Sequence, residues 1–361
     1  MNQWKNSVKE FRDNPRHYPR KILLRLYNFF HKNLPKVNPP TSFLSILYIV
    51  QEKLGDGFLT LPFLYEFHDQ FPQVKISVLA SKYNYRLFEP LDFLEEVLIY
   101  RQDPKELYRK LADRHYDLFF NPKDHPSLTL LRMMKHIHAG CKIGLEHPQH
   151  NKHYNFLLEN NESMPVIEKN GLLLNLYGGK VALKNEVPII DHLEADFWKN
   201  LPSESLFGHM CINLSSGGSL RKLQTAKWIE IINYIFQNKL SFKINLLAMP
   251  ENHADAMIIK SKFLNKINYP IPTKNIYEAG IVIKNSCLFI SPDTALVHVA
   301  AAVKTPVIGL YQNKGLNLNR FSPYGVDCEI VLSPDREIGN IQTTQIIKAL
   351  ENLCHENNIH Q

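Results

Sequence analysis

Residues 287–311 constrain the fold of this chain more than any other stretch. An apolar run, Cys287–Ile290, is typical of a buried strand. Ala295–Val303 then predicts a short and very apolar helix, and Pro306–Tyr311 predicts the next strand. A strand, a helix and a second strand in this order indicate a unit of a parallel α/β sheet.

The start of this expected helix carries residue types that suit an anion. Pro292 presets φ for a helix start, and Asp293 and Thr294 are good N-cap residues. A helix that begins at the carboxyl edge of a parallel sheet directs unpaired N–H groups and a partial positive charge at a ligand, so phosphates bind there. The simpler interpretation is that Asp293 or Thr294 only caps the helix and that His298 is a core residue. A histidine, an aspartate and a threonine near one helix mouth favour a binding site.

The same alternation of strands and helices runs through two blocks of the chain, separated by a less regular region at 145–190. A chain of 361 residues with 44% hydrophobic and 21% charged residues predicts a globular protein of two domains. Both domains are expected to be doubly wound parallel sheets. The expected strands are Leu44–Val50, Val74–Leu79, Val97–Tyr100, Tyr116–Phe120, Cys141–Gly144, Met210–Leu214 and Phe242–Ala248. The expected helices are Phe58–Phe71, Pro104–Arg114, Ser127–His136, Thr225–Gln237, Asn252–Phe263, Asn275–Lys284 and the terminal Gln342–Leu353.

Two further loops follow leading strands and should line a cleft at the carboxyl ends of the strands. In Lys53–Gly57, two glycines permit close backbone approach, and Asp56 between them is either a helix N-cap or a working carboxylate. In Ser215–Lys222, glycines, hydroxyls and two cations precede a helix and suit an anionic ligand. The alternative for this second loop is a flexible segment with exposed cations.

Positive charge is concentrated at the N-terminus. Residues 1–36 hold nine Lys/Arg and two acids, and the other 325 residues hold 33 bases and 33 acids. Lys21–Lys32 mixes apolar and basic residues at helical spacing, which is typical of a surface for anionic membranes. The alternative is a helix packed on the domain with a solvated basic face. Nucleic acid binding is disfavoured, because no basic stripe continues into the body of the chain.

Several classes of site are excluded by the motifs that the sequence lacks. There is no dinucleotide fingerprint, no P-loop, no nucleophile elbow and no His-Glu-x-x-His helix, so neither a cofactor nor a metal is expected. The five cysteines are isolated, which favours a reducing compartment over a disulfide framework. No apolar run approaches the roughly 20 residues of a membrane span, and no signal peptide is visible, so a cytoplasmic location is expected.

Three motifs together resemble glycosyltransferase family 9, the lipopolysaccharide core heptosyltransferases. The stretch ISPDTALVHVAAAVKTPVIGLY is similar to the family's C-terminal Asp-Thr/Ser-Gly-x-x-His signature, with Ala295 in place of its glycine. The stretch around Gly55–Pro62 resembles the family's Gly-Asp-x-x-x-Thr-x-Pro opening. SSGGSLRKLQTAKWIEII resembles its lysine-containing middle motif, in which spacing from Trp228 favours Arg221 and residue type favours Lys222.

The resemblance implies a GT-B fold, with two Rossmann-like domains facing a central cleft. The expected parts are a basic extension at 1–43, an acceptor-side domain at 44–185, a nucleotide-sugar domain at 186–340, and a C-terminal helix at 341–361 that crosses back to the first domain. It also implies inverting transfer of a sugar, most commonly heptose from ADP-heptose, to a lipid A-core acceptor, without an essential metal. Asp56 would be the general base, and Lys222 or Arg221 would stabilise the leaving diphosphate. The expected substrate-binding residues are Gly55, Gly57, Thr60, Ser215, Ser216, Gly217, Asp293, Thr294, Ala295 and His298.

The location and the rival functions follow from the same resemblance. A lipid-linked acceptor would bring the protein to the cytoplasmic face of the inner membrane, with residues 1–36 as a peripheral contact. The alternatives are a nucleotide-sugar 2-epimerase, which needs no acceptor, and a non-catalytic, membrane-associated nucleotide-sugar-binding protein.

Overall fold

The chain folds into two compact units. The computed structural model describes residues 18–50, 53–100, 103–178, 186–188, 191–199, 201, 206–238, 243–313, 317–357 and 359. The first unit comprises Met1–Lys53, Phe67–Glu162 and Lys169–Lys180, and the second comprises Leu54–Glu66, Ser163–Glu168 and Val181–Gln361. The segment Leu54–Glu66, which carries Asp56, therefore groups with the second unit.

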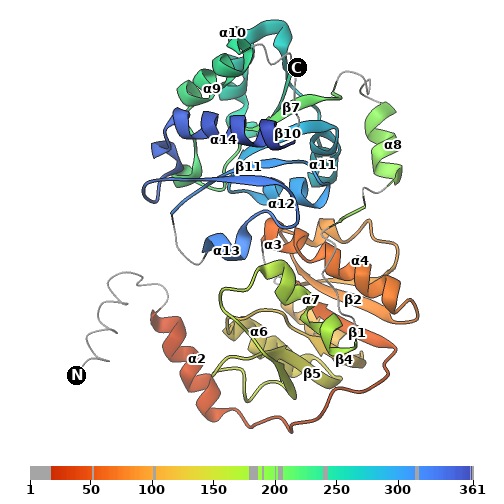
Figure 1. Ribbon diagram of the computed structural model, residues 1–361. Helices are drawn as coiled ribbons and strands as arrows, with labels where there is room; N and C mark the ends of the chain where they lie inside the picture. The colour runs from red at the N-terminus through yellow and green to blue at the C-terminus, as the bar shows by residue number, and fades with distance from the viewer. Residues whose placement is uncertain are drawn as a thin grey trace, which may run out of the picture. The chain divides into compact units, whose positions relative to one another are not determined.

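The first unit is built on a six-stranded parallel sheet with the strand order β3-β2-β1-β4-β5-β6 (Figure 1). Alternate residues of β1 face opposite sides: Leu47 and Ile49 lie in a core cluster with residues of α2, α5 and α6, whereas Tyr48 donates a hydrogen bond to Asn170 of α7. The strands are β1 (Ser45–Ile49), β2 (Lys75–Ser81), β3 (Leu94–Tyr100), β4 (Tyr116–Phe120), β5 (Ala139–Leu145) and β6 (Phe156–Leu158). The helices of this part of the chain are α2 (Tyr18–Phe30), α3 (Leu54–Phe58), α4 (Leu61–Gln70), η1 (Tyr85–Leu87), α5 (Pro104–Ala112), α6 (Leu128–Met133), η2 (Met134–His136) and α7 (Val166–Leu176).

The second unit repeats this topology in a six-stranded parallel sheet with the order β12-β11-β10-β7-β8-β9. Its first and fourth strands, β7 and β10, are neighbours at the centre, as β1 and β4 are in the first unit. The strands are β7 (His209–Asn213), β8 (Ile244–Leu247), β9 (Ile267–Asn268), β10 (Ser286–Pro292), β11 (Val307–Tyr311) and β12 (Cys328–Leu332). The helices are α8 (Asp191–Lys199), η4 (Ser219–Arg221), α9 (Thr225–Gln237), η5 (Pro250–Asn252), α10 (His253–Phe263), η6 (Leu264–Lys266), α11 (Ile276–Lys284), α12 (Ala295–Ala302), α13 (Asn317–Phe321), η7 (Ile338–Asn340) and α14 (Thr343–Glu356).

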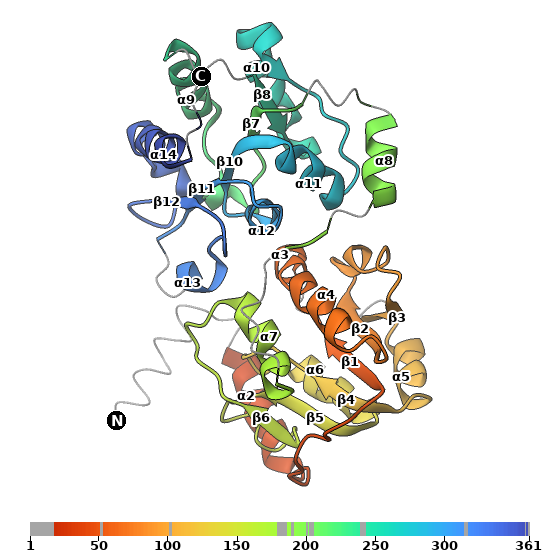
Figure 2. The ribbon, with the colours of Figure 1, turned by 45° about the vertical axis from the view of Figure 1, so that its right-hand side comes forward.

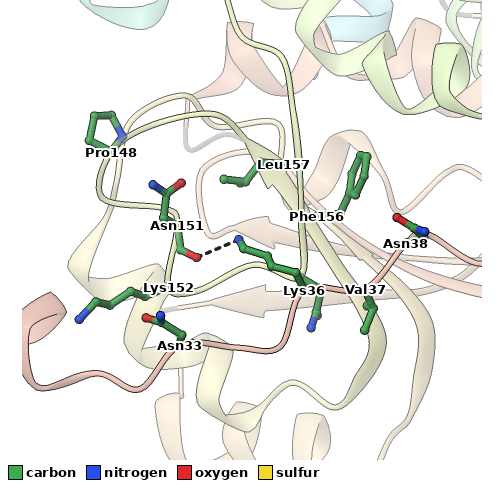
Figure 3. A pocket seen from close by; sticks show the side chains of 10 residues that line it. Asn33, Lys36, Val37, Asn38, Pro148, Asn151, Lys152, Phe156 and Leu157 are labelled. Atoms are coloured by element: carbon green, nitrogen blue, oxygen red, sulfur yellow. Dashed lines mark hydrogen bonds between the residues drawn. The ribbon is translucent and has the colours of Figure 1, made fainter.

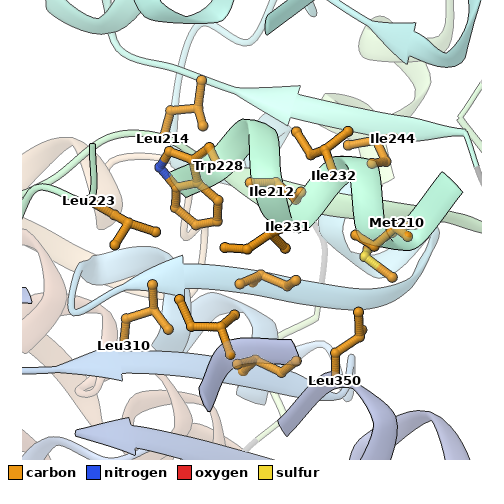
Figure 4. Close-up of a cluster of buried hydrophobic side chains, with 14 of the residues drawn as sticks. Met210, Ile212, Leu214, Leu223, Trp228, Ile231, Ile232, Ile244, Leu310 and Leu350 are labelled. Atoms are coloured by element: carbon orange, nitrogen blue, oxygen red, sulfur yellow. The ribbon is translucent and has the colours of Figure 1, made fainter. Parts of the chain in front are cut away.

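One face of the second sheet is covered by α9, α10 and α14. Trp228, Ile231 and Ile232 of α9 contact the strands in an apolar cluster that also contains Leu350 of α14 (Figure 4). A capping box starts α14, because the Gln342 side chain accepts from the backbone and Gln345 returns a bond to the Gln342 N–H at 3.0 Å. Helix α14 packs beside α9 and β12 within the second unit (Figure 2).

The expected helix Phe58–Phe71 is interrupted in the structure. It forms α3, a turn at residues 59–60, and α4. Pro62 lies in the first turn of α4 and has no N–H to donate to the carbonyl of Phe58, so a continuous helix would lose a hydrogen bond there. Asp56 was expected in the loop before this helix. In the structure it lies in the first turn of α3. Within the described ranges, every helix is too short or too polar to span a bilayer.

Candidate functional site

The centre of the second sheet gathers polar groups at the carboxyl ends of β7 and β10. Asn213, at the end of β7, is buried and donates to Ser291 Oγ at 3.0 Å and to Thr294 Oγ1 at 3.3 Å. Successive strands are added on one side of β7 up to β9 and then on the other side from β10, so the strand order reverses between β7 and β10. Ligands of doubly wound sheets bind at such a point. Asn213 was not predicted as a site residue; its only signal in the sequence is that it is the one polar residue within the apolar strand Met210–Leu214.

The N-terminus of α12 opens at this point of the sheet. Thr294 is the N-cap, and its hydroxyl accepts from Leu296 N–H at 3.3 Å, so Asp293 is not the cap. Thr294 is itself fastened to β7 through Asn213. The Val297 N–H donates to the Thr294 carbonyl at 3.3 Å. The N–H of Ala295, the first residue of the helix, has no intrahelical acceptor by geometry and lies at the positive end of the helix dipole.

Arg221 and Lys222 form ion pairs with different carboxylates. The Arg221 guanidinium donates to the Asp293 carbonyl at 3.0 Å and lies 3.2 Å from the Asp293 carboxylate, so its charge lies at the mouth of α12. Lys222 lies 2.8 Å from the Asp255 carboxylate in α10. The hydrogen bond from Lys222 is the main cause that lowers the pKa of Asp255, with a second from Thr225. Arg221 is thus the cation that the structure brings to the predicted phosphate position.

The loop between β7 and η4 is shaped by short-range hydrogen bonds. Ser215 is buried; its N–H donates to Asn213 at 3.0 Å, and its hydroxyl accepts from Met249 N–H at 2.7 Å. Ser216 donates to the Gly218 carbonyl at 3.1 Å. Gly218 has a φ of +149°, which side-chain-bearing residues rarely adopt. A Cβ on Gly217 would lie 3.5 Å from the Arg221 guanidinium, which is an ordinary van der Waals distance, so Gly217 lies directly beside that side chain.

The helix that carries Asp56 packs directly on α12. A Cβ added to Gly55 would lie 3.3 Å from Ala295 Cα and 3.4 Å from the His298 ring, so glycine permits this close approach. Asp56 itself is half-buried, Gly57 is buried, and the buried Thr60 donates to the Asp56 carbonyl at 3.2 Å. Three predicted residues from opposite ends of the sequence, namely Gly55, Ala295 and His298, therefore lie together.

His298 is a buried, neutral imidazole in this packing. Burial lowers its pKa to about 4. Its Nδ1 atom has no hydrogen-bond partner among the described residues, and the ring lies against Gly55. His298 therefore supports the junction of α3 and α12 through packing.

The first unit carries an ion pair that the sequence analysis did not single out. Lys169 of α7 lies 2.5 Å from Asp124, which follows β4, and the two side chains are only 1% and 5% exposed. Beside it, the buried Asn121 donates to Tyr154 at 2.6 Å. A buried charge pair of this kind fixes α7 against the end of the central strands. No group of three or more His, Cys, Asp or Glu suited to a metal ion occurs among the residues that the structure describes.

Comparison with solved structures identifies the fold. The chain is similar to a glycosyltransferase family 9 protein from Veillonella parvula, with 16% identity over 88% of this chain and 98% of the other and a TM-score of 0.69. Heptosyltransferase WaaC from E. coli, solved with ADP, matches at 16% identity over 86% of this chain and all of the other, with a TM-score of 0.69. The E. coli ADP-heptose LPS heptosyltransferase II matches at 15% identity over 87% of this chain and 100% of the other, with a TM-score of 0.66. The expected α/β fold of GT-B type is confirmed.

Comparison of sequences identifies the family. A search of curated proteins finds no match. The profile of glycosyltransferase family 9 (heptosyltransferase) matches residues 105–350, which is more than half of the chain and includes Arg221, Asp293 and His298. The protein is therefore a glycosyltransferase that belongs to glycosyltransferase family 9, the heptosyltransferase family.

Proposed function

We propose that this enzyme transfers a sugar with inversion from a nucleotide-sugar donor, ADP-heptose, to a lipopolysaccharide or lipooligosaccharide core acceptor. The main support for this proposal is the position of the Arg221 guanidinium beside Asp293 at the N-terminus of α12. A cation beside the positive end of a helix suits the diphosphate of a nucleotide sugar. The two E. coli relatives, WaaC solved with ADP and the ADP-heptose LPS heptosyltransferase II, support an ADP-linked donor.

In the proposed reaction, Asp56 takes the proton of the acceptor hydroxyl. The hydroxyl oxygen forms a bond to the anomeric carbon, the bond from that carbon to the diphosphate oxygen breaks, and the diphosphate leaves with the electron pair. General-base assistance contributes roughly 10²–10⁴ in rate. The packing of Gly55 on Ala295 supports this role, because it fixes the Asp56 helix to the helix that faces the leaving group.

The leaving diphosphate gains negative charge, which Arg221 and the α12 N–H groups stabilise. One preorganised donor of this kind is worth about 3 kcal/mol in the barrier. Asp293 holds sugar hydroxyls rather than phosphate, because two anions repel, and its contact with Arg221 partly neutralises it. Ser215, Ser216 and Gly217 shape the loop beside the donor, and Thr294 and Ala295 present the helix mouth. Neither a cofactor nor a metal takes part in this scheme.

The proposed acceptor also suggests the role of each region and the location of the enzyme. The 44–185 region would serve the acceptor and the 186–340 region the donor. A lipid-linked core acceptor places the enzyme at the cytoplasmic face of the inner membrane, in peripheral contact through the basic residues 1–36. Nucleic acid is not a partner in this proposal.

The test is ADP release by the purified enzyme across a panel of nucleotide sugars, with and without delipidated core acceptors. Release that needs both ADP-heptose and acceptor supports the proposal. Turnover of a nucleotide sugar without acceptor would indicate an epimerase, and binding of the donor without any release would indicate a non-catalytic binding protein.

The general base is tested by Asp56→Asn, which keeps the size of the side chain and removes the carboxylate. We expect kcat to fall by roughly 10²–10⁴ with unchanged donor affinity. Asp69→Asn, in α4 of the first unit, is the matched control. Near-wild-type turnover of the Asp56 variant would exclude Asp56 as the base.

A further inference from the structure

Helix α2 is fastened to the first unit along one side only. Leu24 is buried in the core, and the Tyr27 hydroxyl donates to the Leu131 carbonyl at 3.1 Å. The Asn28 amide donates to the Gln149 carbonyl at 3.2 Å. These three residues lie at helical spacing on one face, so the rotation of α2 about its own axis is fixed.

The opposite face of α2 is apolar and exposed. Its five large hydrophobic residues are between 43% and 79% exposed, with Phe29 and Phe30 the most exposed at 76% and 79%. In an α-helix of 3.6 residues per turn they fall within one continuous stripe opposite Leu24. An apolar stripe on a soluble surface marks an interaction site, because scattered single residues would not align in this way. The stripe consists of Ile22, Leu23, Leu26, Phe29 and Phe30.

Cations flank this stripe. Arg25 and Lys32 are exposed, and residues 1–36 together hold nine bases against two acids. Past the end of α2 the chain enters a groove of about 870 Å³ whose lining includes Lys36, Lys152 and Asn151 (Figure 3). The Lys36 ammonium donates to two backbone carbonyls, of Asn151 at 2.9 Å and of Tyr154 at 3.1 Å, which holds its charge at the groove.

We propose that α2 is an interfacial anchor that inserts Phe29 and Phe30 among the acyl chains of an anionic bilayer. Arg25 and Lys32 then meet the phosphates at the surface, and the groove with Lys36 and Lys152 receives lipid headgroups. Apolar and cationic residues side by side fit a lipid surface with negative headgroups. A second copy of the chain fits less well, because its own excess of bases would face the same cations. The inference rests on the proposed function, which requires a lipid-linked acceptor, and adds apolar insertion to a purely electrostatic contact.

The experiment is cosedimentation of the full chain with vesicles of phosphatidylethanolamine and phosphatidylglycerol, at low salt and at about 0.5 M NaCl, where charges are screened beyond a few ångströms. Because insertion does not depend on charge, part of the binding should resist salt. Phe29→Ser/Phe30→Ser should lower this salt-resistant partitioning about tenfold or more. The matched control, Leu44→Ser/Phe207→Ser, removes two exposed apolar residues that lie outside α2 and should bind as wild type.

A second arm separates charge from insertion. Lys152→Gln should weaken low-salt binding about fivefold and leave the salt-resistant part unchanged. Equal salt-resistant binding by wild type and the Phe29→Ser/Phe30→Ser variant would overturn the proposal. A dimer in sedimentation that this variant abolishes would also overturn it, in favour of a second copy.

A third arm separates this inference from the proposed function. The Phe29→Ser/Phe30→Ser variant should keep wild-type turnover on delipidated acceptor in solution, because α2 lies outside the catalytic residues. If wild type has no transferase activity with any donor, the proposed function fails, and the vesicle comparison still decides whether α2 inserts.

Discussion

Arg221 and Lys222 are neighbours in the sequence, but only Arg221 contacts Asp293. We expect Arg221→Gln to lower kcat/KM by roughly 10²–10³, because a donor to the leaving diphosphate is lost. Lys222→Gln removes a contact with Asp255 in which the lysine side chain is 45% exposed, so its effect on stability should stay within about 1 kcal/mol. The measurement is kcat/KM of the two variants with ADP-heptose, which shows which of the two cations acts on the leaving diphosphate. A large loss in Lys222→Gln with little in Arg221→Gln would reverse the assignment.

At the scale of elements, the junction of α3 and α12 predicts a dependence of stability on pH. Burial lowers the pKa of His298 to about 4, whereas an imidazole in the unfolded chain titrates near about 6.5. Between these values the unfolded state binds a proton that the folded state does not, so the free energy of unfolding falls as the pH falls. From pH 7 to pH 5 the loss is about 2 kcal/mol.

This loss is measured by thermal denaturation at the two pH values. His298→Leu cannot take up the proton and should show a smaller decrease between pH 7 and pH 5 than wild type. The exposed His138→Gln is the control and should follow wild type. Identical pH dependence in wild type and His298→Leu would contradict the buried neutral state of His298.

The elements also show how far the sequence could predict the structure. Apolar runs and N-cap residues located most strands and helices, and α9 has the predicted bounds. Pro62 was expected in the first turns of one helix from Phe58, whereas it stands in the first turn of α4, after the break that follows α3. The strand β9 consists of Ile267 and Asn268, and two residues are too few to show the alternation of apolar and polar side chains that indicates a strand. Helix α7 was missed because Asn170 is a weak helix former, yet tertiary burial stabilises it.

The candidate site, like the fold, was predictable only where short stretches of sequence determine the structure. Motifs predicted that Asp293 and Thr294 lie at a helix start after a strand, and the structure has them there. The sequence left Arg221 and Lys222 as alternatives. The partner of Arg221 could not be predicted, since it depends on how the β7 loop turns at Gly218. The hydrogen bonds of Asn213 could not be predicted either, because they depend on the pairing of β7 with β10, which only the tertiary structure shows.

At the scale of the whole molecule, the chain contains two sheets of the same strand order, each with its own apolar core. Each unit therefore has an independent source of stability, and a substitution buried in one core should act on that unit first. The buried pair Lys169 and Asp124 belongs to the first unit and offers a direct test.

Lys169→Met should destabilise the first unit by about 3–5 kcal/mol, because it leaves the Asp124 carboxylate buried without its cation. Hydrogen exchange followed by mass spectrometry should show faster exchange in β4 and β5 and unchanged exchange in β7 and β10. Adding Asp124→Leu should restore much of the lost protection, since an apolar pair needs no compensating charge. Lys199→Met breaks an exposed ion pair with Asp196 and is the matched control, with an expected cost within about 1 kcal/mol. Equal acceleration in both sheets would show that the two units unfold as one, and the cores would then not be independent.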